Sequence, residues 1–115
     1  MVTAVAFALL AAAGALTRAA ATGRWNRPGS LPAGTLAVNV TGCLLLGALR
    51  GADLAPPAVT VLGTGMVGAF TTFSGFAADT VGLATSGRRA RAGAYVALSL
   101  VAGLLAAALG DALAQ

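Results

Sequence analysis

Four long stretches of the chain carry no charged side chain and consist mainly of apolar and small residues. These stretches cover residues 1–17, 28–49, 54–78 and 92–110. A helix that crosses a lipid bilayer needs roughly 20 mainly apolar residues, within a range of about 17 to 25. The pattern therefore predicts a single all-α membrane domain with four transmembrane helices. Their expected bounds are about 2–20, 32–50, 56–84 and 90–112.

The composition supports an integral membrane protein. The 115 residues are 58% hydrophobic and 9% charged, with a mean hydropathy of +0.90, whereas a soluble domain carries about 25% charged residues. The first stretch has the length of a signal peptide, but it lacks a basic leading region and Arg18 follows it, so we expect a retained helix. The net charge of +4 does not indicate a nucleic-acid partner, because the basic residues lie at helix ends and do not alternate with aromatic residues.

The arginines are crowded on one side of the predicted domain. With four spans, the first and third connections share a side, and six of the seven arginines lie near it: Arg18, Arg24, Arg27, Arg88, Arg89 and Arg91. Only Arg50 lies on the other side, together with Asp53 and Asp111. Cytoplasmic loops of membrane proteins carry an excess of Arg and Lys. We therefore expect a multi-pass protein of the inner (plasma) membrane with loops one and three in the cytoplasm.

Polar residues in the second stretch share one helix face. Thr35, Asn39 and Cys43 follow one another at intervals of four residues, and Asn39 falls near the middle of the membrane. An amide offers two N–H donors and one acceptor, so Asn39 either replaces part of the hydration shell of an ion or holds two helices together. Cys43 cannot form an internal disulfide, because it is the only cysteine, and it is expected to be a small packing residue.

The third stretch is poor material for a continuous helix. Its sequence combines glycines with small hydroxyl residues: Gly63, Gly65, Gly68, Thr71, Thr72, Ser74 and Gly75. Glycine weakens a helix interior, so we expect a break near the middle of this helix that exposes backbone carbonyls. Such carbonyls at membrane depth coordinate a cation or line a cavity. The alternative is that the glycines only allow close helix packing.

Two phenylalanines at the end of the third stretch and two hydroxyl residues in the fourth are further candidates for an ion path. Phe73 and Phe76 lie three residues apart, on one helix face just after the expected break. The edges of aromatic rings are electropositive and can face an anion without a fixed charge, although such a pair is also common in a core. In the fourth stretch, Tyr95, Ser99 and Gly103 form a stripe that serves either as a polar track or as a packing surface.

The residues that are missing limit the possible functions. The chain has no Glu, Lys or His, and its aspartates fall at or near the ends of the apolar stretches. Proton-coupled export, as in a small multidrug exporter, needs a carboxylate within the membrane. No catalytic or metal-binding cluster can be assembled from these residues, so we expect no enzyme activity. A membrane assembly subunit without a transport path is a further alternative.

Three segments resemble the CrcB, or Fluc, fluoride channel family. They are GALTR at 14–18, GTLAVNVTG at 34–42 and GAFTTFSGF at 68–76, and the similarity runs in order through nearly the whole chain. The resemblance implies a passive, fluoride-selective channel that exports fluoride and relieves its toxicity. It also implies an antiparallel dimer with two pores. The fluoride pore residues that it implies are Asn39, Thr72, Phe73, Ser74, Phe76, Tyr95 and Ser99.

The same resemblance implies a sodium ion at the dimer centre. The backbone carbonyls of Gly68 and Thr71 would hold this ion, and Arg18 would have a structural role at the end of the first helix. The chain departs from the family pattern at Gly75, where the family commonly has a second hydroxyl residue, and at Ala69, where it often has a second glycine.

The partner follows from the resemblance together with the arginine bias. A homodimer of oppositely inserted copies needs a chain with little bias, and this chain has six arginines on one side against one on the other. We therefore expect a fixed orientation with both termini outside, and pairing with an antiparallel second subunit. The arginine bias favours a related, oppositely oriented chain as this subunit, and a homodimer of two copies is the alternative.

Overall fold

The computed structural model describes all 115 residues, and they form an all-helical bundle. The elements are α1 (Val2–Trp25), α2 (Ala33–Gly51), α3 (Pro56–Val59), η1 (Thr60–Val67), α4 (Gly68–Phe70), α5 (Phe73–Thr85) and α6 (Arg89–Ala114). Four spans are long and apolar enough to cross a membrane, because α3, η1, α4 and α5 together make one span over Pro56–Thr85. The prediction of a four-helix membrane protein is confirmed.

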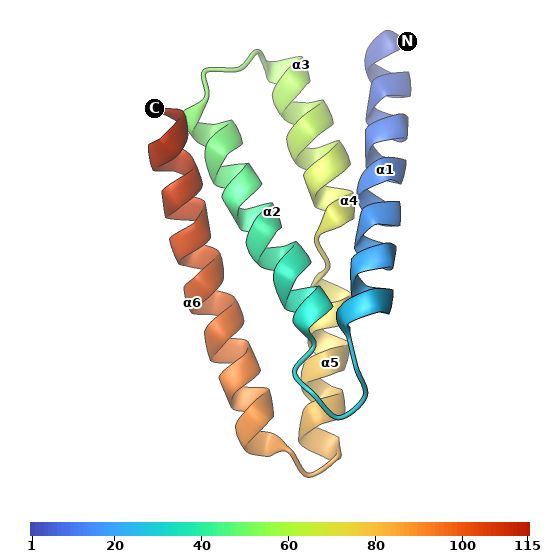
Figure 1. The fold of residues 1–115 in the computed structure, drawn as a ribbon. Coiled ribbons are helices and arrows are strands. Elements are labelled where there is room, and N and C mark those ends of the chain that lie inside the picture. Colours follow the sequence, from blue (N-terminus) through green and yellow to red (C-terminus); the bar gives the residue numbers. More distant parts are fainter.

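The four spans run up and down beside one another (Figure 1). The α1–α2 loop and the α5–α6 turn lie at one end, which we call the loop end, and both termini lie at the other. The bundle is thin, with extents of 48 × 29 × 18 Å, and only 15 of the 115 residues are buried. Many large apolar side chains are therefore exposed, and lipid or a second subunit must cover them.

Helices α2 and α6 approach each other closely along their length because glycines line their contact. A Cβ atom added at Gly47 would overlap the backbone of Ala107, and one added at Gly110 would overlap the carbonyl of Leu44. Small residues allow such close approach between membrane helices. These two helices therefore form the most closely packed pair of the bundle, whereas η1 and α4 of the third span lie mainly against α1 and α5 lies mainly against α6.

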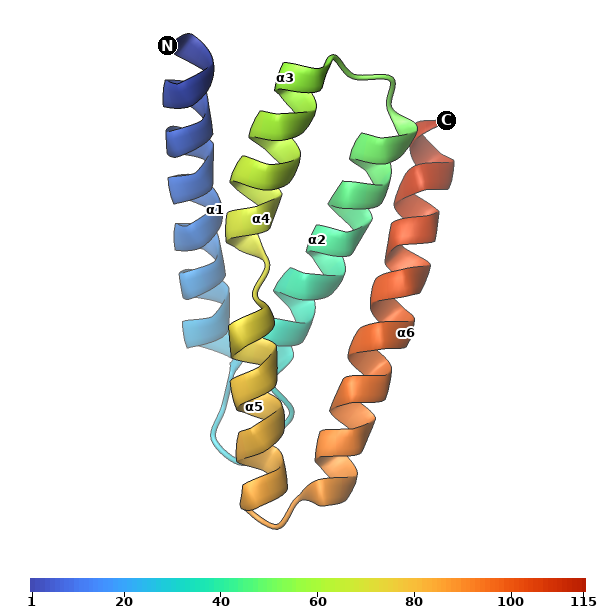
Figure 2. The same ribbon diagram turned by 180° about the vertical axis from the view of Figure 1, so that it is seen from behind.

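The third span is broken near its middle, as predicted. The chain leaves α4 at Thr71 and is extended at Thr71 and Thr72 before α5 begins (Figures 1 and 2). The break falls at the two adjacent threonines that the glycines flank. The residues before it, Thr60–Val67, form a π-helix, which the sequence did not indicate. Single turns of π-helix inside α-helices occur often at functional sites.

Asn26 fixes the start of α2 at the loop end. Its side-chain oxygen accepts hydrogen bonds from the backbone N–H groups of Gly34 (2.8 Å) and Thr35 (3.1 Å). These are among the first N–H groups of the helix, which have no partner within it. Helix α1 ends just before Asn26, at Trp25, and so runs further than the predicted end near residue 20.

Candidate ion pathway at the helix break

The Asn39 side chain holds the break in place. Its Nδ2 donates to the carbonyl of Thr72 at 3.0 Å, and its Oδ1 accepts from the N–H of the same residue at 2.8 Å. Both backbone groups of Thr72 are thus satisfied by one amide from α2. Unpaired backbone groups are costly in a membrane, so this side chain makes the break possible. One of the two amide hydrogens of Asn39 remains free.

The break releases two backbone carbonyls from their usual helical partners. In a continuous helix, the N–H of residue i bonds the carbonyl of residue i−4. Here the N–H of Thr72 turns to Asn39 instead of the carbonyl of Gly68. The N–H of Gly75 donates to Oγ1 of Thr72 at 3.0 Å instead of the carbonyl of Thr71. The carbonyls that lose their helical hydrogen-bond donors are therefore those of Gly68 and Thr71, which are the two carbonyls expected to bind sodium.

Arg18 reaches the break from within α1, and not from the end of this helix as expected, because α1 continues to Trp25. Its Nη1 donates to the Thr71 carbonyl at 3.3 Å, across 53 residues of sequence. An N–H···O bond is usually about 2.9–3.0 Å long, so this contact is a weak one. The Gly68 carbonyl has no such side-chain contact, and Gly68 itself lies on the surface of the chain. The released carbonyl oxygens suit a hard cation, which prefers oxygen ligands.

A cavity of about 320 Å³ lies at the break, and we call it the break cavity. It is lined by Asn39, Cys43, Leu46, Thr71, Thr72, Phe73, Phe76 and Leu100. Four of the predicted pore residues meet here, and no charged side chain lines the cavity. The ring centroids of Phe73 and Phe76 are 6.1 Å apart, and the Phe73 side chain is 81% exposed. Cys43 lines this cavity, and its sulfur also packs against Gly103.

The predicted pore residues Ser74, Tyr95 and Ser99 lie outside the lining of the break cavity. Ser74 Oγ is 3.3 Å from the hydroxyl of Thr72, which caps α5. The Tyr95 ring packs against that of Phe76 in a tilted arrangement, with centroids 5.4 Å apart, and Tyr95 is fully buried. The hydroxyl groups of Tyr95 and Ser99 are buried and have no hydrogen-bond partner. Such a group costs free energy unless water or an ion satisfies it.

A second cavity, of about 430 Å³, opens at the loop end and contains residues that sequence reasoning missed. Asn26 and Asp79 line it, and Oγ1 of the buried Thr35 connects them. Thr35 donates to Asp79 Oδ2 at 2.6 Å and accepts from Asn26 Nδ2 at 2.8 Å. The position of Thr35 on the same helix face as Asn39 was the available signal. Nothing in the local sequence pointed to Asp79.

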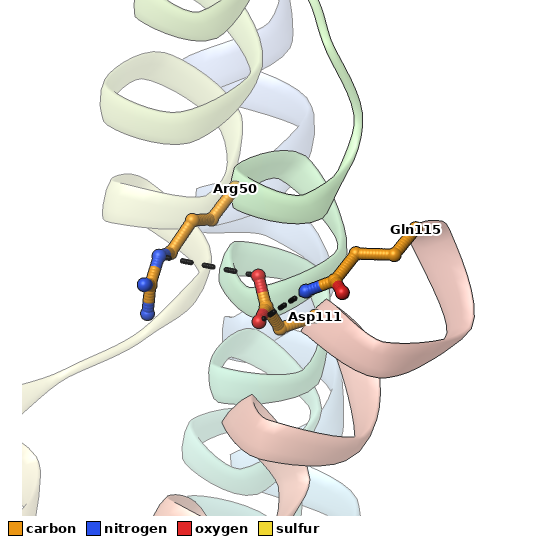
Figure 3. Close-up of polar contacts among 3 residues, drawn as sticks. All are labelled: Arg50, Asp111 and Gln115. Carbon is orange, nitrogen blue, oxygen red and sulfur yellow. Dashed lines mark hydrogen bonds and ion pairs between the residues drawn. The ribbon is translucent and has the colours of Figure 1, made fainter.

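A third cavity, of about 480 Å³, lies at the opposite end between α2 and α6. Arg50 and Asp111 line it, with Arg50 Nε 3.9 Å from Asp111 Oδ1 (Figure 3). Gln115 donates to the other oxygen of Asp111 at 2.8 Å. The Arg50 side chain is 83% exposed, so this ion pair adds little stability.

The break cavity and this third cavity share Leu46. Hollows therefore follow α2 from mid-membrane to the end of the bundle that carries the termini.

Comparison with known proteins identifies close relatives along nearly the whole chain. The family model described as CrcB-like protein, Camphor Resistance (CrcB), matches residues 5–111. The fluoride-specific ion channel FluC 2 of Rhodococcus jostii (strain RHA1) is 47% identical over 104 residues, which cover 90% of each chain. The fluoride-specific ion channel FluC of Pseudomonas fluorescens (strain Pf-5) is 46% identical over 111 residues, covering 90% of this chain and 89% of the relative. The FluC of Pseudomonas syringae pv. tomato (strain DC3000) is 42% identical over 121 residues, covering 98% and 97%.

Proposed function

Because this chain belongs to the CrcB-like family, we propose that it forms a fluoride-selective channel that lets fluoride leave the cell down its gradient. The single observation that carries this proposal is the break cavity. It combines the Asn39 amide, two phenylalanine rings and no charged side chain. Relatives that are named fluoride-specific ion channels support the same proposal. Fluoride export relieves toxicity, and no enzymatic step is needed for it.

The chemistry of the site suits a small and strongly hydrated anion. A channel must replace the hydration shell of its ion and yet bind it weakly enough to let it leave. The free N–H of Asn39 is an available donor in the break cavity. The unpartnered hydroxyls of Tyr95 and Ser99 are further donors outside its lining, with the Tyr95 ring against that of Phe76. The ring edges of Phe73 and Phe76 add weak positive potential. Since no arginine lines the cavity, the ion meets no fixed charge that would hold it.

A second subunit completes this pathway in the proposed channel. The break cavity is open on the surface of a thin chain, and Phe73 is largely exposed. A partner in the opposite orientation would cover this surface. The partner is either a second copy or a related chain, and the six arginines near the loop end favour a related chain of opposite orientation. Loops one and three would then face the cytoplasm of a cell whose plasma membrane holds the pair.

Sodium is the cofactor that the released carbonyls fit. We assign its ligands to the carbonyls of Gly68 and Thr71, because both have lost their helical donors. One chain offers only two carbonyl ligands at this place, fewer than a hard cation takes, so the ion would lie between two subunits that each contribute both oxygens. When bound, sodium supplies a fixed positive charge at the subunit contact. The chain's own contribution is the break that turns these oxygens out of the helix.

Fluoride efflux from liposomes that contain only this purified protein tests the proposal. A fluoride electrode should record rapid efflux from fluoride-loaded vesicles, whereas chloride should stay inside. The Phe76→Ile variant should lose the efflux because it removes an aromatic edge from the break cavity. The Phe70→Ile variant is the matched control, since Phe70 lies just before the break and does not line this cavity.

The outcomes separate the candidate functions. Efflux by the single protein would show that one chain type suffices and would contradict the heteromeric arrangement. If efflux requires co-expression with a related chain, the heteromer is correct. If neither preparation conducts fluoride, this chain is not a channel, and the assembly-subunit alternative takes its place.

A further inference from the structure

The Thr71 carbonyl already has one cationic partner within the chain. Arg18 Nη1 lies 3.3 Å from this oxygen, and this is the only hydrogen bond that the Arg18 side chain makes. The contact is half-buried. Arg18 forms no ion pair with a carboxylate, and the one ion pair of this chain joins Arg50 and Asp111. An uncompensated guanidinium charge therefore lies against one of the two carbonyls assigned to sodium.

Two positive charges on one carbonyl oxygen oppose each other. A carbonyl has two lone pairs, so geometry alone permits a second partner, but two cations at one half-buried oxygen repel each other. The long Arg18 contact is also easily given up, since a bond of this length is weak. Of the two assigned carbonyls, only that of Thr71 has this neighbour, which makes the two ligands of one chain electrically unequal.

We propose that Arg18 is an internal cation that competes with sodium at the Thr71 carbonyl and so sets the sodium affinity of the break. This inference rests on the sodium site proposed above. In the absence of sodium, the guanidinium stabilises the carbonyl that the break has released. When sodium binds, the guanidinium gives up its contact with the Thr71 carbonyl, and the long, flexible arginine side chain turns away from the break.

The opposite role for Arg18 would be that of a positioning residue. In that case its hydrogen bond would orient the Thr71 carbonyl for sodium, and removal of the bond would weaken sodium binding. Competition and positioning therefore predict changes of opposite sign in the same measurement. Stability at different sodium concentrations separates them without any measurement of fluoride flux.

Thermal unfolding of the purified, assembled protein in detergent provides the test. Sodium chloride is titrated against N-methyl-glucamine chloride at constant ionic strength, and the sodium concentration at half-maximal stabilisation is read for each variant. Arg18→Gln should lower this concentration by about tenfold or more, because a neighbouring unit charge is removed from a partly shielded site. It should also unfold at a lower temperature than the wild type without sodium and gain more stability from sodium.

Two further variants serve as controls for charge and for position. Arg18→Lys keeps the charge, so its half-maximal sodium concentration should stay close to that of the wild type. Arg24→Gln removes the same charge from α1 at a residue that makes no side-chain hydrogen bond, and it should change nothing. An unchanged or higher half-maximal concentration in Arg18→Gln would overturn the competition. If sodium does not stabilise the wild type at all, the sodium site and this inference both fail, whereas the fluoride channel is still tested by the liposome assay.

Discussion

The exchange of Asn39 for aspartate tests the double role of this side chain. The change keeps the shape of the side chain and the hydrogen bond that accepts from the Thr72 N–H at 2.8 Å. It removes the donor to the Thr72 carbonyl, and it brings an anionic oxygen to the place that this donor holds at 3.0 Å. An unpaired buried carbonyl costs about 1–3 kcal/mol. We therefore expect Asn39→Asp to lower the stability of the folded chain by at least this amount.

The effect on ion flux has a separate cause and is larger. Asn39 lines the break cavity, so the new carboxylate would face any anion that enters it. Two like charges about 4 Å apart repel each other by about 4 kcal/mol at an effective dielectric constant of about 20. Since 1.4 kcal/mol corresponds to a factor of about ten, occupancy by fluoride should fall by about a thousandfold. Fluoride efflux from liposomes should then be undetectable.

The variant Asn39→Ala provides the comparison that can refute this reasoning. It removes both hydrogen bonds to Thr72 and adds no charge, so it loses stability through the unpaired backbone groups alone, without the cost of a buried carboxylate. It should conduct more fluoride than Asn39→Asp, because no carboxylate faces the ion. Thermal unfolding in detergent checks that both variants are folded. If folded Asn39→Ala conducts no more fluoride than folded Asn39→Asp, Asn39 does not face the ion.

Three further changes test separate parts of the site. Gly42→Ala should destabilise the folded chain at the break by about 1–3 kcal/mol, because the added Cβ would overlap Thr71 Cγ2. The control Gly23→Ala places its Cβ in open space and should not lower the unfolding temperature. Tyr95→Phe should keep or slightly raise stability, since its buried hydroxyl has no partner to lose, and should slow fluoride efflux; a clear loss of stability would contradict this. Silver ions should block efflux by binding the thiol of Cys43 in the break cavity, and Cys43→Ser should abolish that block.

The spans and the break could be predicted because they depend on local sequence. Four apolar stretches of sufficient length determine four spans, and a glycine-rich segment with adjacent threonines indicates a break. The grouping of Thr35, Asn39 and Cys43 on one helix face is equally local, because it follows from the helical repeat. The resemblance to the CrcB family added the roles of residues on different helices.

The contacts across the bundle could not be predicted, because they depend on how the helices rotate and tilt against one another. Arg18 and Thr71 are 53 residues apart, and Thr35 and Asp79 are 44 residues apart. No periodicity links such pairs. The π-helix of Thr60–Val67 was missed for a similar reason, since its hydrogen bonds have no composition signal of their own. Asp79 was taken for a residue at the end of an apolar stretch, because the sequence does not show that it accepts a hydrogen bond from Thr35 of α2.

The break explains why a membrane helix can offer donors and carbonyls at the same depth. Asn39 uses one N–H and its oxygen to satisfy Thr72, and this exchange is what frees the carbonyl of Gly68. Thr72 in turn uses its hydroxyl to satisfy Gly75, which frees the carbonyl of Thr71. Each polar side chain thus replaces a backbone partner and releases a backbone oxygen. The proposed anion path along the amide and the proposed cation site at the carbonyls would therefore both depend on one interruption, and a change that closes the break should remove both together.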